Sequence, residues 1–174
     1  FLRPAELASD AASSIDAVLH AIDAVEAEGN SVDILMLLEQ TSPLTEASDI
    51  DRALEVFVKG LPDVDSLVGV TETVTANPAF LVRKADNGTI KPYLGGEFGT
   101  LPRRQDIEPC FALDGSLYIA TPQALRRERS FCHARTAGFA MPAHKSLEVD
   151  DLVDFICIEA IAAQLDKIAA TDAA

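Results

Sequence analysis

The sequence predicts an α/β fold in which helices cover both faces of a parallel β-sheet. A helical apolar repeat over residues 15–25 is followed by an unbroken apolar run at residues 34–38. The same order of helix and strand recurs over residues 48–73. Because short connections between alternating helices and strands give right-handed crossovers, the strands should run parallel. With 174 residues the chain is long enough for a sizeable core, so we expect one domain over residues 1–174.

The composition excludes several classes of partner. The formal net charge is −14 and the isoelectric point is near 4.4, whereas binding of a nucleic-acid polymer needs a basic face. A nucleotide is compatible with this charge, since Mg²⁺ can bridge carboxylates to phosphates. No stretch is apolar for long enough to span a bilayer, so we expect no membrane segment. Cys110, Cys132 and Cys157 lack metal-ligand spacing and are interpreted as reduced thiols of a cytoplasmic protein.

Each predicted helix of the first half begins with a polar residue. Ser13 and Asp16 form a start that is similar to a capping box, and Ser48 and Asp51 repeat this spacing before the second helix. Glycines end both helical patterns. A second, largely buried strand is expected over residues 65–73.

The strand at residues 32–38 is expected to lie at the centre of the sheet. Its apolar run stands between Gly29-Asn30 and Pro43, which suits a strand buried on both faces. The chain then turns polar, and ligands of open α/β sheets bind beyond the carboxyl ends of the strands. These polar residues are therefore a candidate site: Glu39, Gln40, Thr41 and Ser42. The alternative, which spacing alone favours, is a strand end whose threonine and serine only complete a turn.

The second half departs from this regular alternation. Turn signals divide short strand-like pieces and predict a β-rich excursion over residues 76–108, followed by a return strand at residues 115–120. A short basic helix at residues 123–129 should present a solvated face, and a short strand is expected at residues 137–141. The last predicted helix, residues 151–169, is apolar nearly all round and should be well buried.

A second candidate site lies before the last helix. In an extended segment side chains alternate, so Glu148 and Asp150 share a face while Leu147 and Val149 point into the core. Two carboxylates at a strand end suit Mg²⁺, which prefers hard oxygen ligands and keeps several waters. The alternative, favoured by composition alone, is that Asp150 or Asp151 caps the last helix while Glu148 is solvated.

A third candidate site combines adjacent arginines with an amide. In an otherwise acidic chain, Arg103-Arg104-Gln105 suggests recognition of a carboxylate or phosphate, for which the guanidinium fork is suited. The alternative is an exposed loop that pairs with nearby acids. The sequence shows no nucleophile motif and no glycine-rich phosphate-binding loop.

Four segments together resemble the acylneuraminate cytidylyltransferase family, which makes CMP-activated nonulosonic acids such as CMP-sialic acid. In chain order they are LLEQTSPLTEASDID, SLVGVTE followed by NPAF, RRQDIEPCFALDGSLYI, and KSLEVDDLVDF. Five positions depart from the family pattern. Glu39-Gln40 replaces Gln-Pro, Thr45 replaces Arg, Asp114 replaces Asn, and Glu148 replaces the first metal-binding Asp.

The resemblance implies a Rossmann-like nucleotidyltransferase with an inserted β-rich dimerisation arm at residues 76–108. It implies transfer of a cytidylyl group from CTP to a nonulosonic sugar acid, in a homodimer formed through about residues 79–104. The implied Mg²⁺ ligands are Glu148 and Asp150, which with Arg104 are the implied catalytic residues. The implied substrate-binding residues are Glu39, Gln40, Thr41, Ser42, Arg103, Gln105 and Asp114.

The family begins with a strand and a loop rich in Gly, Lys and Arg that holds the CTP phosphates. This chain begins Phe1-Leu2-Arg3-Pro4, so we expect the nucleotide cradle to be missing from it and the 174 residues alone to be inactive. Two alternatives stay open. One is a non-catalytic, shortened relative that dimerises or binds a sugar acid. The other is a related sugar nucleotidyltransferase that uses another nucleotide or a Kdo-like acid.

Overall fold

A mixed four-stranded sheet forms the centre of the molecule. The structure, a computed structural model, describes residues 1–9, 12–73, 76–99 and 102–172, and the Arg104 side chain lies outside this description. The strand order is β1 (Leu35–Leu38), β5 (Phe111–Ala120), β2 (Ser66–Glu72) and β6 (Thr136–Ala140). β2 pairs in parallel with β6, whereas β5 is antiparallel to both β1 and β2.

The α/β class is confirmed, but the expectation of a parallel sheet is wrong for β5. After β2 the chain leaves the sheet at the carboxyl end of that strand and crosses the arm, residues 76–108. It re-enters at the same end, so the returning strand must run in the opposite direction. β1, β2 and β6 share one direction, as the alternation of helices and strands predicts.

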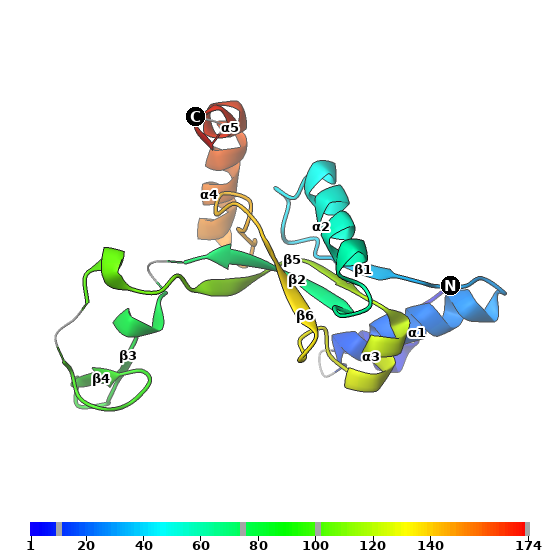
Figure 1. The fold of residues 1–174 in the computed structure, drawn as a ribbon, viewed down its shortest axis with the longest axis horizontal. Coiled ribbons are helices and arrows are strands. Elements are labelled where there is room, and N and C mark those ends of the chain that lie inside the picture. The colour runs from blue at the N-terminus through cyan, green and yellow to red at the C-terminus, as the bar shows by residue number, and fades with distance from the viewer. Residues whose placement is uncertain (10–11, 74–75, 100–101, 173–174) are drawn as a thin grey trace.

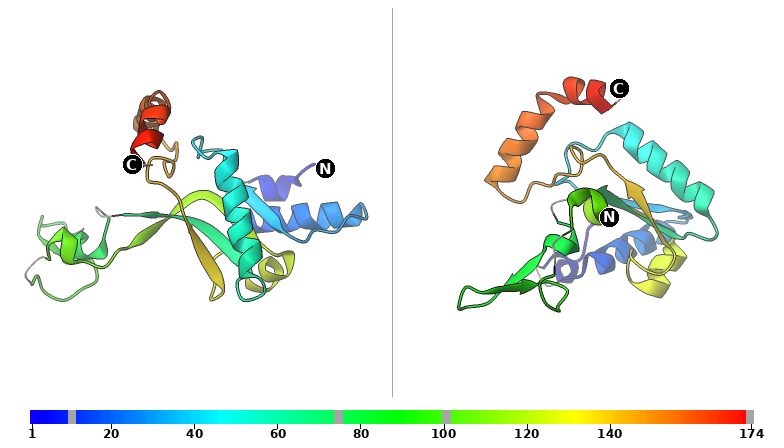
Figure 2. Two further views of the ribbon diagram at one scale, coloured as in Figure 1. Left: turned by 45° about the horizontal axis from the view of Figure 1, so that its top comes forward. Right: turned by 60° about the vertical axis from the view of Figure 1, so that its left-hand side comes forward.

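Helices cover both faces of the sheet (Figures 1 and 2). On one face α2 (Ala47–Gly60) buries Ala53 and Phe57 against Leu67 and Ile119. On the other face α1 (Ser14–Ala27) and α3 (Pro122–Glu128) enclose a second cluster. That cluster contains Val18, Ile22, Val68, Ala120, Leu125 and Phe131. The three layers follow from the alternating side-chain directions of β2 and β5.

β1 is an edge strand, so its expected place at the centre of the sheet is wrong. β5 occupies the position between β1 and β2, and among the described residues β1 pairs with β5 alone. Its residues are therefore half-buried, and Leu38 is 46% exposed. An apolar run between glycine and proline residues predicts that a strand forms there, but it does not distinguish an edge position in the sheet from a central one.

The arm contains less strand than its turn signals suggest. β3 (Val82–Lys84) and β4 (Ile90–Pro92) form a separate two-stranded antiparallel sheet at one end of the molecule (Figure 1). Short 3₁₀ helices, η2 (Pro78–Phe80) and η3 (Arg104–Asp106), flank it, and η1 (Ala5–Ala8) precedes α1.

The last predicted helix is two helices, α4 (Leu152–Ala162) and α5 (Leu165–Asp172), and the expectation that it is well buried is wrong. α4 projects away from the sheet (Figures 1 and 2), and Leu152 is 71% exposed. An apolar helix needs a neighbouring layer to bury it, and α4 lies beside none of the sheet strands in these views. No helix of the described residues is long and apolar enough to cross a membrane.

The helix starts differ from the predicted caps. The Ser13 side chain makes no capping hydrogen bond at α1. α2 begins one residue before Ser48, because Glu46 and Asp49 form its capping box. The Asp49 carboxylate accepts from the Glu46 backbone N–H at 3.0 Å. Burial of Asp49 under the later part of the chain selects this cap, and local spacing does not reveal that burial.

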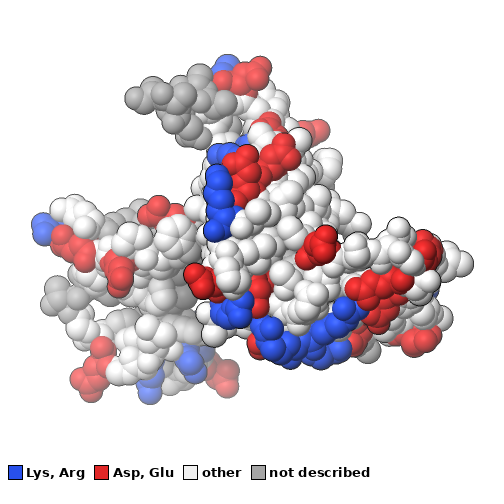
Figure 3. Space-filling view, turned by 45° about the vertical axis from the view of Figure 1, so that its right-hand side comes forward, with Lys and Arg blue, Asp and Glu red and all other residues white. Residues whose placement is uncertain are grey.

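The basic face of α3 is paired with acids rather than open. Arg126 contacts Asp23 and Glu26 at 2.7 Å each, and Arg129 pairs with Asp16. Figure 3 shows Lys and Arg beside Asp and Glu along this side of the molecule. The arginines are exposed, as expected for a solvated face, and they tie α3 to α1.

Candidate functional site

A bulge in β5 organises the candidate site. Val68 pairs with Tyr118 and Val70 pairs with Leu113, so residues 114–117 stand opposite Gly69 alone. Gly115 takes a left-handed conformation with φ +68°, which a residue with a Cβ adopts only with strain. Bulges of this kind re-aim side chains, and here the redirected side chain is Asp114.

Asp114 is buried and fully hydrogen-bonded within the protein. Its Oδ1 accepts from the Ser116 backbone N–H at 3.0 Å and from the Ser116 hydroxyl at 2.7 Å. Its Oδ2 accepts from the Ser146 hydroxyl at 3.1 Å. A Cβ at Gly69 would lie 3.0 Å from Asp114 Cγ, so the glycine makes room for this carboxylate. Asp114 therefore links the bulge to the segment that carries the acidic pair.

The polar residues after β1 lie against that same segment. The Glu39 backbone N–H donates to the Ser116 carbonyl, and the Ser42 N–H donates to the Glu39 carbonyl, which closes a turn. The Thr41 carbonyl accepts from the Val149 N–H at 2.8 Å. The structure thus brings residues 39–42 beside residues 146–150. Glu39 and Thr41 are half-buried, Gln40 is exposed, and Ser42 is buried with no hydrogen-bond partner for its hydroxyl among the described residues.

Glu148 lies over the bulge in an unfavourable electrostatic environment. A Cβ at Gly115 would lie 2.7 Å from Glu148 Cδ, which places the Glu148 carboxylate directly against the glycine. Burial raises the pKa of Glu148, and the negative charges of Asp150, Asp114 and Glu39 raise it further. Mutual repulsion of this kind is what a bound cation relieves.

The same acids affect an aromatic neighbour. Burial raises the pKa of the Tyr118 hydroxyl, and the charges of Glu148 and Glu39 add to the increase. The Tyr118 ring packs on Phe131 at 5.2 Å between ring centroids. Tyr118 therefore forms a protonated, aromatic wall beside the acidic residues.

The Mg²⁺ ligand set stays a prediction. Within the described part of the chain, no group of three or more His, Cys, Asp or Glu side chains is arranged to hold a metal ion. Glu148 and Asp150 nevertheless have the donor chemistry that Mg²⁺ prefers, since it often takes one or two carboxylates plus phosphates and waters. Asp151 is engaged elsewhere, because its Oδ1 caps α4 by accepting from the N–H groups of Val153 and Asp154.

That cap matches one part of the alternative interpretation of this segment. Asp151 does cap the helix, as the alternative interpretation proposes, but Glu148 is half-buried rather than solvated. Residues 147 and 149 are also half-buried, and residues 146–149 form no strand. Residues 146–149 are all half-buried, so the burial pattern does not show the expected alternation between core and solvent.

The arginine stretch stands apart from the acids. Arg103 and Gln105 are exposed on the η3 turn of the arm, and Arg103 donates to Asp106 at 2.7 Å. Within the described part of the chain, neither Arg103 nor Gln105 contacts Glu148 or Asp150. The Arg104 side chain lies outside the described residues. For Arg103, the exposed loop that pairs with a nearby acid matches the structure within this chain.

Sequence reasoning missed several residues that build the site. Lys145 and Ser146 anchor the acidic segment, and Gly69 and Gly115 provide the space for carboxylates. An Asp-Gly pair inside a strand pattern is a signal for a bulge and could have found Gly115. The other three depend on contacts between distant parts of the chain.

Comparisons with known proteins show what the chain is similar to. No protein-family model matches the chain. A solved CMP:2-keto-3-deoxy-manno-octonic acid synthetase complexed with CTP has a TM-score of 0.52 at 13% identity, over 91% of this chain and 70% of that one. At this identity the likeness concerns the fold alone.

Curated proteins similar to this chain include N-acylneuraminate cytidylyltransferases. The N-acylneuraminate cytidylyltransferase of Streptococcus agalactiae serotype V is 32% identical over 155 residues, which are 89% of this chain and 35% of the relative. Flagellin modification protein B of Campylobacter coli is 29% identical, over 91% of this chain and 66% of the relative. The CMP-N,N'-diacetyllegionaminic acid synthase of Legionella pneumophila is 26% identical over the same shares. The chain is thus related to the acylneuraminate cytidylyltransferases, and it spans about a third of the length of the first of these relatives.

Proposed function

We propose that the protein transfers a cytidylyl group from CTP to a nonulosonic sugar acid. The anomeric hydroxyl of the sugar acid loses its proton and attacks the α-phosphorus of CTP, while the bond to the β-phosphate breaks and pyrophosphate leaves. One observation carries this proposal: residues 39–42 and 146–150 meet through the bond from the Val149 N–H to the Thr41 carbonyl. These are two of the segments that resemble the family, and the meeting places their carboxylates at one edge of the sheet.

We assign Glu148 and Asp150 as the residues that hold Mg²⁺. Bound there, Mg²⁺ would neutralise phosphate charge and lower the pKa of the attacking hydroxyl. The raised pKa of Glu148 supports this assignment, because a cation would stabilise the carboxylates that now repel one another. Thr41 and Ser42, with Glu39 and Gln40, would line the sugar pocket. Asp114 would face the same pocket and, with both oxygens already hydrogen-bonded, would act by holding its shape.

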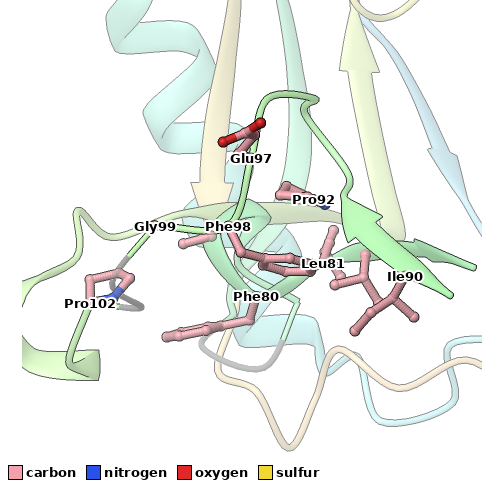
Figure 4. Close-up of a pocket in the computed structure, with 10 residues that line it drawn as sticks. Phe80, Leu81, Ile90, Pro92, Glu97, Phe98, Gly99 and Pro102 are labelled. Carbon is pink, nitrogen blue, oxygen red and sulfur yellow. The ribbon is translucent and has the colours of Figure 1, made fainter.

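We also propose a homodimer through the arm, with Arg103, Arg104 and Gln105 meeting the substrate's carboxylate or phosphates across the interface. A two-stranded sheet is marginally stable alone, so the apolar surface of the arm needs a cover. A second copy fits this need, because the arm carries an apolar cavity of about 370 Å³ and exposed apolar side chains such as Leu94. The residues that line this cavity include Phe80, Leu81, Ile90, Pro92 and Phe98 (Figure 4).

The first test is a pyrophosphate-release assay of the full-length gene product. It uses CTP with sialic, legionaminic or pseudaminic acid, and a Kdo-like acid as the competing substrate class. We expect pyrophosphate release with a nonulosonic acid. Absence of pyrophosphate release with every keto-acid sugar tested would refute the proposal. We expect the isolated 174 residues to be inactive with CTP, and we place the enzyme in the cytoplasm.

Asp150→Asn gives a sharper test of the metal assignment. Asp150 is exposed, so the substitution should leave the thermal unfolding temperature nearly unchanged. Loss of a metal ligand should lower kcat by at least about tenfold. Wild-type kcat in this variant would remove Asp150 from the metal site.

A second candidate function is a non-catalytic module that binds a sugar acid or dimerises. The exposed apolar side chains of the arm, such as Leu94, favour it, because dimerisation through them needs no catalytic site. Sugar-acid binding by the full-length protein without any CTP turnover would establish this alternative.

A further inference from the structure

Hydrogen bonds and an ion-pair bridge anchor the segment that carries the acidic pair to the fold. Residues 142–150, here called the acidic segment, form a turn followed by extended chain without helix or strand. The Val149 N–H donates to Thr41, and the Ser146 hydroxyl donates to Asp114. A further anchor is Lys145, which reaches the start of α2.

Lys145 forms a buried bridge between the acidic segment and α2. Its Nζ lies 2.7 Å from Asp49 Oδ2 and 2.7 Å from Glu46 Oε2, and its side chain is 12% exposed. Asp49 is fully buried. Arg52 also contacts Asp49, but from the same helix, one turn later. Lys145 is therefore the partner of Asp49 that joins two separate parts of the chain.

The charges of this bridge are matched in the folded state. Burial alone would lower the pKa of Lys145, yet hydrogen bonds to Asp49 and Glu46 raise it, so the ammonium stays charged. Burial likewise disfavours the charged Asp49, but hydrogen bonds from Lys145, the Glu46 backbone and Arg52 lower its pKa. Loss of Lys145 would leave Arg52 alone, among the described residues, to compensate the buried charge of Asp49. Removal of one partner of a buried ion pair is more damaging than removal of both.

We propose that Lys145 is a positioning residue that fixes Glu148 relative to residues 39–42 and Asp114. Glu148 lies between anchored residues along the chain. Before it, Lys145 is bridged to α2 and Ser146 is hydrogen-bonded to Asp114; directly after it, Val149 is hydrogen-bonded to Thr41. Because α2 begins six residues after Thr41, the same bridge also sets the distance between the acidic segment and the turn at 39–42. The catalytic consequence of this inference rests on the proposed function, whereas its structural consequence does not.

Amide hydrogen exchange of the 174-residue chain tests the structural part. Lys145→Met should make the Val149 amide exchange about tenfold faster than in wild type, because the segment can open locally. Lys145→Arg should restore most of the protection. Arg52→Gln is the matched control, since it removes a cation from Asp49 but leaves the bridge in place, and it should leave Val149 exchange unchanged. Equal exchange in Lys145→Met and wild type, or equal acceleration by Arg52→Gln, would overturn the proposal.

A double variant keeps the test valid if Lys145→Met alone does not fold. Asp49→Asn combined with Lys145→Met removes both charges and retains an oxygen for the helix cap, so the fold should persist. Fast exchange at Val149 should remain in this variant, because the bridge is absent. Protection equal to wild type would show that the bridge does not hold the segment.

Mg²⁺ dependence of the full-length enzyme tests the catalytic part. Residues that orient metal ligands typically change metal affinity or activity by 10–100-fold, so Lys145→Met should raise the half-saturating Mg²⁺ concentration by roughly tenfold. Arg52→Gln should not change it. A lower unfolding temperature with an unchanged Mg²⁺ requirement would show a merely structural role. Absence of turnover in the wild-type enzyme would instead refute the proposed function, and hydrogen exchange would still decide the positioning role.

Discussion

Gly115→Ala is the most informative single substitution at the candidate site. Gly115 sits in the β5 bulge at φ +68°, and a methyl group there would lie 2.7 Å from Glu148 Cδ. Left-handed backbone costs a residue with a Cβ about 1–2 kcal/mol. Ordinary contact needs 3.4 Å, so the Glu148 carboxylate must move away by most of an ångström. Since misplacement by about 1 Å can cost 100-fold in rate, kcat of the full-length enzyme should fall by at least roughly tenfold.

Gly29→Ala separates the cost of the left-handed backbone from the displacement of the Glu148 carboxylate. Gly29 has φ +88°, and a methyl group there would meet nothing within 4 Å. Both substitutions should therefore lower the free energy of unfolding by about 1–2 kcal/mol, measured by urea denaturation. Only Gly115→Ala should lower kcat. Equal kcat for the two variants would refute the argument that Gly115 makes room for a functional carboxylate.

Three further predictions concern stability. Glu148→Gln should raise the free energy of unfolding at neutral pH by roughly 0.2–1 kcal/mol, because it removes like-charge repulsion. This gain should fade as pH falls through the raised pKa of Glu148, where the wild-type side chain protonates; a gain independent of pH would contradict it. Because the pKa of Asp49 is lower in the folded state than its unfolded value near 3.8, the ionised Asp49 stabilises the fold above pH 3.8, and this stability is lost as pH falls through the folded-state pKa. Asp49→Asn should therefore make the free energy of unfolding, measured by urea denaturation, depend less on pH in the acid range. Asp65→Asn should cost about 1.5–3 kcal/mol, because the buried carboxylate accepts from Arg127 at 2.9 Å and contacts Arg135 at 3.1 Å; an unchanged urea midpoint would exclude this role.

Local sequence patterns predicted the elements better than their arrangement. The apolar periodicities over residues 15–25 and 48–58 correspond to α1 and α2, and the run at 34–38 contains β1. Placement of β1 at the edge depends on β5, which enters from more than 70 residues later. The exposure of α4 likewise depends on which elements lie beside it, and its apolar composition alone indicates the opposite.

The candidate site was only partly visible in the sequence. The motifs identified residues 39–42, Asp114 and Glu148, and the structure brings these together. The bulge that aims Asp114 and the Lys145 bridge escaped notice, because each depends on the pairing of distant segments. The arginine stretch lies on the arm, so within one chain its position does not reveal a role at the acids.

Pyrophosphate release by the full-length gene product tests the central claim most directly. With CTP, Mg²⁺ and a nonulosonic acid, we expect release that depends on the sugar acid and that falls by at least about tenfold with Asp150→Asn. Absence of release with every nonulosonic and related keto-acid sugar, from a protein that is folded by circular dichroism, would contradict the account.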